Sequence, residues 1–500
     1  MSSTTESKQE ITREVVRTPS RMRNPFGKYR VVRTSECIGC GKCAELCPHG
    51  VHVRYAAGGG PTRPKDYLCR GEECRKESYF CIDKCPAGAL TMRYNSMFNT
   101  IGDKRWTPDM IVSTWDQAEN GRITIETLEA HIGDSGGGFD KLRLNYPAAP
   151  EKKLKPEEID TSLVLNRRPE GGTQITIDVP WYGGGMSFGS VSPATMVGKA
   201  HAAQVWNTFT CTGEGGYPPH LYPFDHNVIT QVATGLFGVR EETVQRVRIV
   251  EFKYAQGAKP GLGGHLLGDK NTPAVAKMRE AVAGTSLFSP FPFHSVYSIE
   301  DHKKHIDWIL AMNPAALVSA KVSTPTDADM VAVGSYYAGA HIVHLDGSYG
   351  GTGAAPDIAK KNIAMPIEYA IPKVHEFLTN EGIRDKITLI ASGGIRNAHD
   401  IVKSICLGAD GVVIGTSELV ALECIRCSNC ESGRGCARGI ATTDPELSNL
   451  YDVEWSTRRI ANMYHSWHGQ IVDILVKFGV RSVAELRGRT DLLWHVDYSE

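Results

Sequence analysis

Residues 387–417, ITLIASGGIRNAHDIVKSICLGADGVVIGTS, contain the pattern that decides the fold. An apolar run ends in Ser392-Gly393-Gly394, a helical stretch follows at 398–409, and a second apolar run ends in Gly415-Thr416. Apolar, β-branched runs that alternate with amphipathic segments are typical of parallel strands joined by helices. This stretch therefore predicts a strand, a covering helix and the next parallel strand.

The same alternation extends upstream. Seven or eight such units fit a (β/α)8 TIM barrel better than an open sheet, so we predict an α/β barrel over residues 161–470. Glycines and polar residues gather at the predicted carboxyl ends of the strands, where active sites of such barrels lie. The strand candidates are ITIDVP (175–180), TFTCTGEGG (208–216), RIVEFKYAQGAKPG (248–261), ALVSAKVS (316–323), HIVHLDGSYGGTG (341–353), ITLIASGG (387–394) and GVVIGTS (411–417).

Composition excludes several classes of protein. The chain has 500 residues, 41% hydrophobic and 22% charged, with a formal net charge of −1, which gives no electrostatic reason to expect nucleic acid. No run reaches the roughly 18 apolar residues of a membrane span, and the polar start lacks a secretory signal. We expect a cytoplasmic protein whose residues 1–24 form a flexible or partner-bound arm.

Fourteen cysteines without a secretory signal argue for metal binding rather than disulfides. Cys211 and Cys406 stand alone and are expected to be buried thiols. The first group, CIGCGKCAELCP at 37–48, has the bacterial ferredoxin spacing, in which the fourth cysteine ligates a second cluster. A second group, CRGEECRKESYFCIDKCP at 69–86, completes that pattern with looser spacing.

Residues 25–95 therefore resemble a small α+β two-cluster ferredoxin domain. The crossover rule predicts one [4Fe-4S] cluster on Cys37, Cys40, Cys43 and Cys85 and another on Cys47, Cys69, Cys74 and Cys81. A pair of zinc sites is the alternative. Clusters of this kind pass single electrons, so another part of the chain is expected to use them.

The loops after the last two predicted strands are expected to bind a phosphate. Gly393, Gly394, Gly415 and Thr416 would bring backbone N–H groups to it without a side chain in the way. Ordinary barrel turns also use glycine, which is the alternative. A phosphate site beside an iron–sulfur domain suggests FMN, which accepts single electrons and delivers a hydride.

Several longer motifs resemble the FMN-binding synthase domain of glutamate synthase, in its archaeal-type form with a ferredoxin-like N-terminus. The resemblance covers about 25–95 and 160–470 and rests on GGGMSFGSVS (183–192), TCTGEGG (210–216), QGAKPGLGGHLLGDK (256–270), VSAKVS (318–323), DGSYGGTGAAP (346–356) and CARGIATTDPEL (436–447). It implies that 2-oxoglutarate and ammonia form 2-iminoglutarate, which reduced FMN converts to L-glutamate.

The resemblance also implies partners. Position 2 is serine and no amidotransferase region precedes the ferredoxin-like segment, so ammonia is expected from a separate glutaminase subunit or from solution. A β-helical glutamate synthase subunit is expected as a further partner. No GxGxxG lies in a βαβ context, so a flavoprotein that oxidises NAD(P)H, or a ferredoxin, would supply electrons.

Carried over by motif, the catalytic candidates are Lys259, Glu214, Lys321, Gln256 and Ser187. Lys321 suits the N1/C2=O edge of the flavin, and Glu214 and Lys259 suit flavin and substrate carboxylates. A surface lysine, a buried Lys–Glu pair and turn residues are the alternatives; His341 and His344 are expected to be core histidines. The remaining candidates for cofactor binding are Gly185, Met186, Gly189, Thr212, Asp346, Gly350, Gly351, Thr352 and Gly353, besides the four phosphate-loop residues.

The third cysteine group, Cys424, Cys427, Cys430 and Cys436, matches most of the family's [3Fe-4S] spacing. Its last gap is one residue longer, and Cys427 adds a fourth thiol. Four thiolates can hold a complete cube, so the sequence favours [4Fe-4S], with [3Fe-4S] and an uninvolved Cys427 as the alternative. Residues 96–160 are expected to be a linker with some helix, and 471–500 a helical tail.

Two other functions remain open at this stage. A sister enzyme would use methylamine and make N-methylglutamate with similar flavin chemistry. A non-catalytic electron-transfer subunit is the other, although such a protein would need none of Lys321, Glu214 and Lys259.

Overall fold

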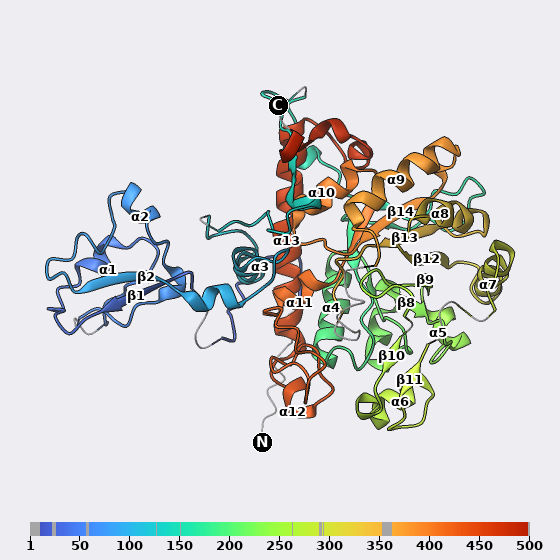
Figure 1. Cartoon of the computed structure of the whole chain (residues 1–500), viewed down its shortest axis with the longest axis horizontal. Helices are drawn as coiled ribbons and strands as arrows, with labels where there is room; N and C mark the ends of the chain where they lie inside the picture. The colour runs from blue at the N-terminus through green and yellow to red at the C-terminus, as the bar shows by residue number, and fades with distance from the viewer. Residues whose placement is uncertain are drawn as a thin grey trace, which may run out of the picture.

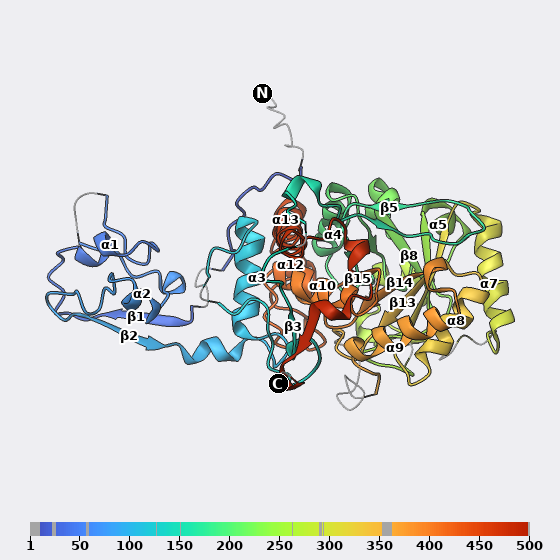
Figure 2. The same ribbon diagram turned by 90° about the horizontal axis from the view of Figure 1, so that it is seen from above.

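The computed structural model describes residues 11–22, 27–56, 60–126, 128–150, 152–262, 264–289, 293, 295–352 and 363–498. The N-terminal domain and the barrel lie on opposite sides of two long helices (Figures 1 and 2). These helices are α3 (Pro108–Asn120) and α13 (Val453–Phe478).

The N-terminal domain is built on one antiparallel pair of strands. β1 (Tyr29–Arg33) pairs along its whole length with β2 (Leu90–Tyr94). Between them the chain forms only short helices, α1 (Lys42–Leu46) and α2 (Glu73–Lys76). Val31, Val51 and Leu90 form a small core against which the cysteines pack.

The barrel has eight parallel strands, which confirms the predicted fold. A backbone hydrogen bond of 2.7 Å from Gly183 N to Phe209 O joins the first strand to the second and closes the ring. Valine and isoleucine are the commonest residues in the strands, and nearly all strand positions are buried, as expected of strands covered on both faces. In chain order the strands are β6 (Trp181–Gly183), β7 (Thr210–Cys211), β8 (Val228–Val232), β9 (Ile249–Lys253), β12 (Leu317–Ser323), β13 (Ile342–Asp346), β14 (Thr388–Ser392) and β15 (Gly411–Ile414).

One strand assignment from the sequence was wrong. Residues 175–180 contribute only β5 (Thr176–Ile177), which pairs antiparallel with β4 (Leu163–Val164) outside the barrel. Two barrel strands, β6 and β8, were missed. The β4–β5 hairpin places Leu163 and Ile177 in one buried cluster with Ile249 and Ile342, the first residues of β9 and β13. It therefore covers that end of the barrel and leaves the carboxyl ends for the site.

Helices cover the outside of the barrel. Several have side-chain caps and glycine ends; Thr107 caps α3, for example, and Gly121 follows it with φ 66°. The helices are α4 (Pro193–Val205), α5 (Glu241–Arg246), α7 (Ile299–Met312), α8 (Ala328–Tyr337), α9 (Ile367–Asn380), α10 (Ala398–Cys406), α11 (Thr416–Ala421) and α12 (Pro445–Ser448), with α6 (Pro273–Arg279) in a small lobe beside β10 (His265–Leu266) and β11 (Leu287–Phe288).

The segments before and after the barrel are docked on it. Thr18 is buried and Arg21 stacks on Tyr451 and Trp455, so residues 11–22 are not the flexible arm expected from the sequence. The expected helical tail at 471–500 is only partly helical, with the end of α13, short 3-10 turns and one strand. α13 runs across position 470 and ends at Phe478, and β16 (Leu493–His495) pairs with β3 (Leu142–Leu144) in the linker.

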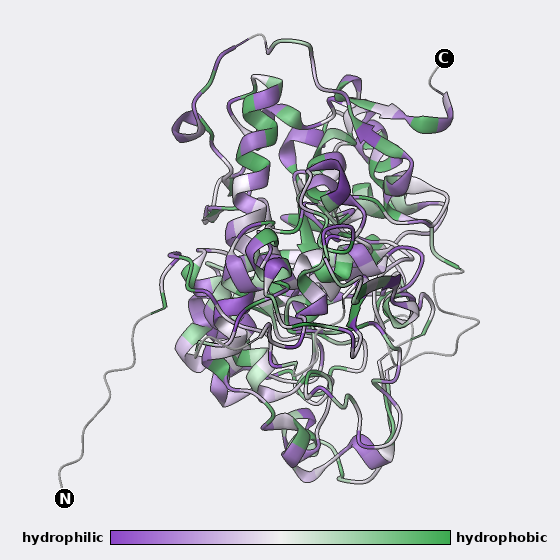
Figure 3. Cartoon of the chain, turned by 90° about the vertical axis from the view of Figure 1, so that its left-hand side faces the viewer, coloured by the Kyte–Doolittle hydropathy of each residue, from purple (hydrophilic) through white to green (hydrophobic). Residues whose placement is uncertain are grey.

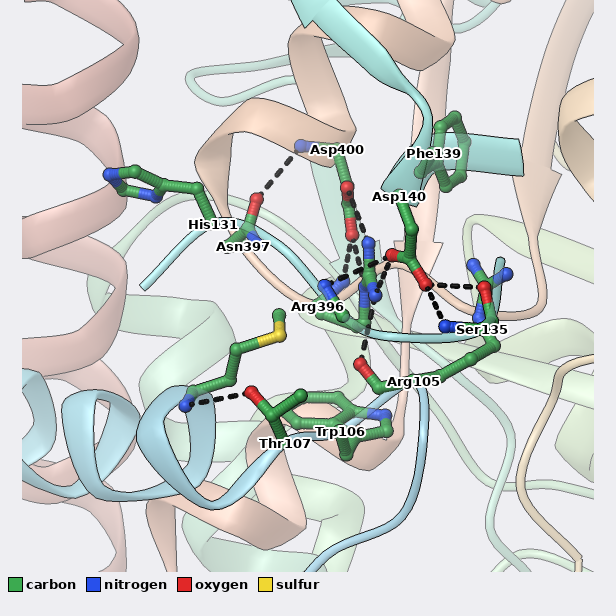
Figure 4. A network of polar contacts seen from close by, with 12 residues as sticks. Arg105, Trp106, Thr107, His131, Ser135, Phe139, Asp140, Arg396, Asn397 and Asp400 are labelled. Carbon is green, nitrogen blue, oxygen red and sulfur yellow. Dashed lines mark hydrogen bonds and ion pairs between the residues drawn. The ribbon is translucent and has the colours of Figure 1, made fainter. Parts of the chain in front are cut away.

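The linker is held by one buried guanidinium (Figure 4). Arg396 precedes α10 and donates to Asp400 at 2.7 Å, to Asp140 and to the carbonyl oxygen of Arg105 at 2.8 Å. The Arg396 side chain is fully buried. Two segments of the linker, near 105 and near 140, are thus tied to the same point of the barrel.

Hydropathy gives no membrane-spanning helix in the part of the chain that the structure describes. In Figure 3 hydrophilic and hydrophobic residues alternate along the ribbon of the long helices. Such alternation is the pattern of helices with one face on a core and the other in water.

We expect Arg396→Met to destabilise the docking of the linker. Removing one partner of a buried ion pair leaves charges uncompensated and costs about 3–5 kcal/mol. The urea midpoint of tryptophan fluorescence should fall, and protease should cut within 96–160 sooner. As a control, Arg240→Met removes an exposed pair with Glu280 and should change the free energy of unfolding by less than about 1 kcal/mol. Equal midpoints for the two variants would contradict the role of Arg396.

Candidate functional site

The eight N-terminal cysteines surround two separate pockets. Cys47, Cys69, Cys74 and Cys81 line one pocket, together with apolar side chains such as Phe80 and Ile82. The other pocket is lined by Cys37, Cys40, Cys43 and Cys85. The structure therefore brings together the same two sets of four that the crossover rule predicts.

The spacing of these sulfur atoms bears on the zinc alternative. Among the described residues, no group of three or more His, Cys, Asp or Glu side chains is close enough to hold a single metal ion. Four thiols that line one pocket without being close enough to hold a single ion fit a larger group better than one tetrahedral ion.

The third cysteine group divides into three and one. Cys424 and Cys436 pack against the barrel core, and Cys424, Cys430 and Cys436 lie near enough to influence one another electrostatically. Cys427 is exposed and lies near Cys430. The backbone turns sharply on both sides of Cys427, with φ 57° at Arg426 and 60° at Ser428. Cys427 therefore differs from the other three by its exposure and by the sharp turns on either side of it.

This cysteine group contacts the linker directly. Cys424 and Ile425 pack against a buried cluster that includes Ile101 and Trp106. Gly102 N donates to Ile425 O at 3.0 Å, and Arg426 forms an ion pair with Asp103. The linker therefore joins the N-terminal domain to the edge of the third cysteine group.

Buried positive charges gather at the carboxyl ends of β7 and β9. Lys253 Nζ lies 2.8 Å from Glu214 Oε1, and Arg279 donates to Ser187 Oγ at 3.2 Å. Lys259 is only 4% exposed and interacts electrostatically with Glu214, Lys253 and Arg279. Glu214 is thus paired with Lys253 rather than Lys259. Three cations act on Glu214, and Glu431, which also acts on Lys259, is itself paired with Lys270. The cluster therefore has an excess of two positive charges when Lys259 is protonated.

Burial sets the protonation states in this cluster. It lowers the pKa of Lys259 to about 8, and Lys253 acts in the same direction while Glu214 opposes it. Burial alone would raise the pKa of Glu214, but Lys253, Lys259 and Arg279 hold it below its usual value. Glu214 is therefore ionised at neutral pH. Lys259 is the cation of this cluster that loses its proton just above neutral pH.

Lys321 lies in the middle of the site, in a row formed by neighbouring strands. It is opposite Lys253 of β9 and His344 of β13, and its Nζ lies 3.4 Å from Asp346. Burial lowers the pKa of Lys321, but Asp346 and Glu251 more than offset this, so the pKa is raised. Lys321 is thus a permanently charged, buried ammonium, not a surface lysine.

A chain of hydrogen bonds runs through the barrel interior below this lysine. Gln231 donates to Glu251 at 2.6 Å, Glu251 contacts His344 Nδ1 at 2.9 Å, and His344 Nε2 contacts Ser392 Oγ at 2.7 Å. Ser392 donates to Asp346 at 2.6 Å. Burial would raise the pKa of Glu251, yet His344 and Lys321 lower it to about 2. His344 is therefore buried as expected, but it belongs to a polar network rather than an apolar core.

The glycine loops after β13, β14 and β15 come together. Gly393 and Gly394 both have positive φ, and a side chain on Gly351 would meet Thr416 Oγ1 at 2.7 Å. A side chain on Gly393 would collide with Gly347, so this glycine is needed for packing between loops as well. Thr352 is also at this edge of the sheet, whereas Gly353 lies outside the described residues.

Other predicted positions lie around the same edge. Gly213 packs against the backbone of Met186 and Ser187, Gly185 faces Gln231, and Gly415 lies near the Met186 methyl group. Thr212 is buried and Gln256 half-buried, in the loops after β7 and β9. Gly189 packs against Val275 and Thr443, and Gly350 has only ordinary contacts.

Sequence reasoning missed three charged residues of the site. Arg279 ends α6, Lys253 ends β9, and Arg105 comes from the linker to lie beside Gly394. A strand-end lysine such as Lys253 was a usable signal. Nothing local marks Arg279 or Arg105, since only the folded chain brings them to the barrel.

Comparison with known proteins agrees with this architecture. The model of a family described as the conserved region in glutamate synthase matches residues 143–481, and that of a 4Fe-4S binding domain matches residues 30–51. The chain belongs to the glutamate synthase family. It is 35% identical over 486 residues to the archaeal-type glutamate synthase (NADPH) of Thermotoga maritima, covering 93% of this chain and 94% of that protein.

Other family members match over different shares of the chain. The archaeal glutamate synthase (NADPH) of Methanocaldococcus jannaschii is 34% identical over 95% of this chain and 96% of its own length. The large chain of glutamate synthase (NADPH) from Azospirillum brasilense is 36% identical over 62% of this chain but 21% of its own length. Among solved structures, the flavin-binding domain of baker's yeast flavocytochrome b2 matches with a TM-score of 0.44 at 15% identity, covering 80% of this chain and 81% of that one. That likeness is too distant to bear on this chain's chemistry.

Proposed function

We propose that this chain is an FMN- and iron–sulfur-dependent synthase subunit that reduces 2-iminoglutarate, formed from 2-oxoglutarate and ammonia, to L-glutamate. The observation that carries the proposal is the buried excess of positive charge around Glu214, beside Lys321, in a member of the glutamate synthase family. An electron-transfer subunit would have no use for a buried site of this charge.

The cation cluster suits the two carboxylates of 2-oxoglutarate. Arg279 Nε is buried and has no hydrogen-bond partner among the described residues, so a donor remains for a carboxylate oxygen. Lys259 adds a second cation, and Ser187 fixes the orientation of Arg279. Glu214, ionised and held by Lys253, can accept a hydrogen bond from the substrate nitrogen.

The loops at the carboxyl ends of the strands suit FMN. Gly394, Gly351 and Gly415 would let backbone N–H groups reach its phosphate, and Lys321 would place a positive charge against its N1/C2=O edge. FMN, when bound, would accept electrons singly and deliver a hydride to the imine carbon. Gly257 N and Lys321 both contact Asp346, which keeps Lys321 in place.

Electrons are proposed to enter through the N-terminal domain and leave through the third cysteine group. We assign Cys424, Cys430 and Cys436 as the ligands of that cluster and leave Cys427 outside, because Cys427 is exposed whereas the other three are partly buried. This assignment favours [3Fe-4S] over the [4Fe-4S] cluster that the cysteine count suggested. The proposed partners are a glutaminase subunit, a β-helical subunit and a flavoprotein or ferredoxin that supplies electrons.

The reaction is tested with the reduced protein. After anaerobic reduction by dithionite, 2-oxoglutarate with ammonium should reoxidise the flavin and yield glutamate, identified by mass spectrometry. Faster formation of N-methylglutamate from methylamine would move the chain to the sister activity. If bound FMN is not reoxidised with either amine, neither glutamate synthesis nor N-methylglutamate synthesis can be assigned to this subunit alone.

The cysteine assignment predicts different outcomes for two neighbouring thiols. Cys427→Ser should keep the iron content and the electron paramagnetic resonance signal of the third cluster. Cys424→Ser should lose that signal and about one cluster's iron, while the two N-terminal clusters stay intact. Loss of the signal in Cys427→Ser would instead establish four ligands and a [4Fe-4S] cluster.

The protonation of Lys259 predicts a pH dependence of substrate binding. As the pH rises through about 8, Lys259 loses its charge, so the affinity of the oxidised holoprotein for 2-oxoglutarate should fall, by on the order of tenfold between about pH 8 and 9.5. Isothermal calorimetry checks this. In Lys259→Arg the guanidinium stays charged, and the fall should disappear over this range. The same decline in both proteins would show that another group is responsible.

A further inference from the structure

Arg105, in the linker before α3, reaches the carboxyl end of the barrel. Its residue is 6% exposed, and its guanidinium carbon lies 4.0 Å from the ring centroid of Tyr349, in the loop after β13. A side chain on Gly394, in the loop after β14, would come within 3.0 Å of Arg105 Nη2. The guanidinium thus lies between two of the glycine loops.

The guanidinium is only partly satisfied. Nη1 donates to Glu368 Oε1 of α9 at 3.3 Å, whereas Nε and Nη2 have no hydrogen-bond partner among the described residues. Leaving donors of a buried cation unpaired is costly, so such groups usually have a ligand or water. Arginine presents its N–H donors as a rigid fork that matches phosphate oxygens.

The backbone of Arg105 is held firmly in this position. Its N–H donates to Asp103 Oδ1 at 2.9 Å, and its carbonyl accepts from the buried Arg396, the residue that ties the linker to α10 (Figure 4). Asp103 in turn pairs with Arg426 beside the third cysteine group. The position of Arg105 beside the Gly394 loop is therefore fixed by backbone contacts on both sides, one of which is fully buried.

We infer that Arg105 binds the phosphate of FMN, so that the linker completes the cofactor site of the barrel. This inference rests on the proposal that the barrel binds FMN. The backbone N–H groups of the Gly394 and Gly415 loops supply neutral donors. Arg396, in the loop after β14, is already paired with Asp140 and Asp400, so Arg105 supplies the positive charge. The barrel alone would then hold FMN weakly, and full affinity would require the docked linker.

The test compares FMN with riboflavin, which has the same ring but no phosphate. Full-length protein freed of flavin is titrated with each, and binding is read from quenching of flavin fluorescence. Wild type should bind FMN more tightly than riboflavin. Arg105→Ala should weaken FMN binding on the order of 10- to 100-fold, as expected for hydrogen bonds to a charged group, and leave riboflavin binding within about twofold. Arg105→Lys should recover part of the loss.

A second variant separates phosphate binding from stability. Arg105→Ala leaves Glu368 buried without its cation, so Arg105→Ala/Glu368→Gln should restore the thermal midpoint without restoring FMN affinity. Lys141→Ala, which removes an exposed linker pair with Asp497, is the matched control and should leave the affinity for both flavins unchanged.

The outcomes distinguish the inference from the function beneath it. An equal fall for FMN and riboflavin in Arg105→Ala, or recovery of FMN affinity in the double variant, would show that Arg105 only holds the linker. Unchanged FMN affinity would likewise overturn the inference and leave FMN binding intact. Wild-type protein that binds neither flavin would overturn the proposed function itself.

Discussion

One buried guanidinium, that of Arg396, holds the linker against the barrel. Arg396 binds Asp400 of its own helix, Asp140 at the far end of the linker and the carbonyl of Arg105 near its start. Burying a cation is favourable only when it is paired and hydrogen-bonded throughout. Arg396 meets that condition with partners from both the linker and the barrel. The same contacts that offset its desolvation therefore fix where the linker crosses the barrel.

The position of the linker determines which groups can exchange electrons. Trp106 and Ile101 pack with Cys424 and Ile425. The backbone N–H of Gly102 also donates a hydrogen bond to the carbonyl oxygen of Ile425. A chain that leaves the N-terminal domain thus passes the third cysteine group before it reaches the glycine loops. The route from cysteine-rich domain to barrel follows the covalent chain and needs no separate docking of two free domains.

The sequence predicts the parts of this structure that depend on local pattern. Parallel strands and their glycine ends follow from periodicity, and the two sets of four N-terminal cysteines follow from spacing. β8 was missed, because VITQV is short and has no helix of regular α form before it. Residues 175–180 look like a barrel strand because an apolar hairpin that covers the barrel floor has the same alternation.

The charged residues of the site show the limit of such reasoning more sharply. Lys321 and Lys259 could be chosen because each follows or lies in a strand with a recognisable motif. Arg279 and Arg105 lie in segments without a motif. Both can be recognised as site candidates only from their burial and their unpaired donors in the folded chain. A buried cation with a free donor is a property of the folded chain, since solvent would satisfy the same group in the unfolded one.

The interior network explains how so much charge can be kept beside an apolar barrel. Lys321 is balanced by Asp346 and Glu251, and Glu251 also binds Gln231 and His344, so each buried charge has partners on neighbouring strands. Around Glu214 the charges are not balanced, because Lys253, Lys259 and Arg279 all act on this single carboxylate. The first arrangement keeps Lys321 charged regardless of substrate, whereas the second leaves positive charge that only an anion can neutralise. The barrel therefore separates a fixed cation from a site that becomes electrically balanced when a dicarboxylate binds.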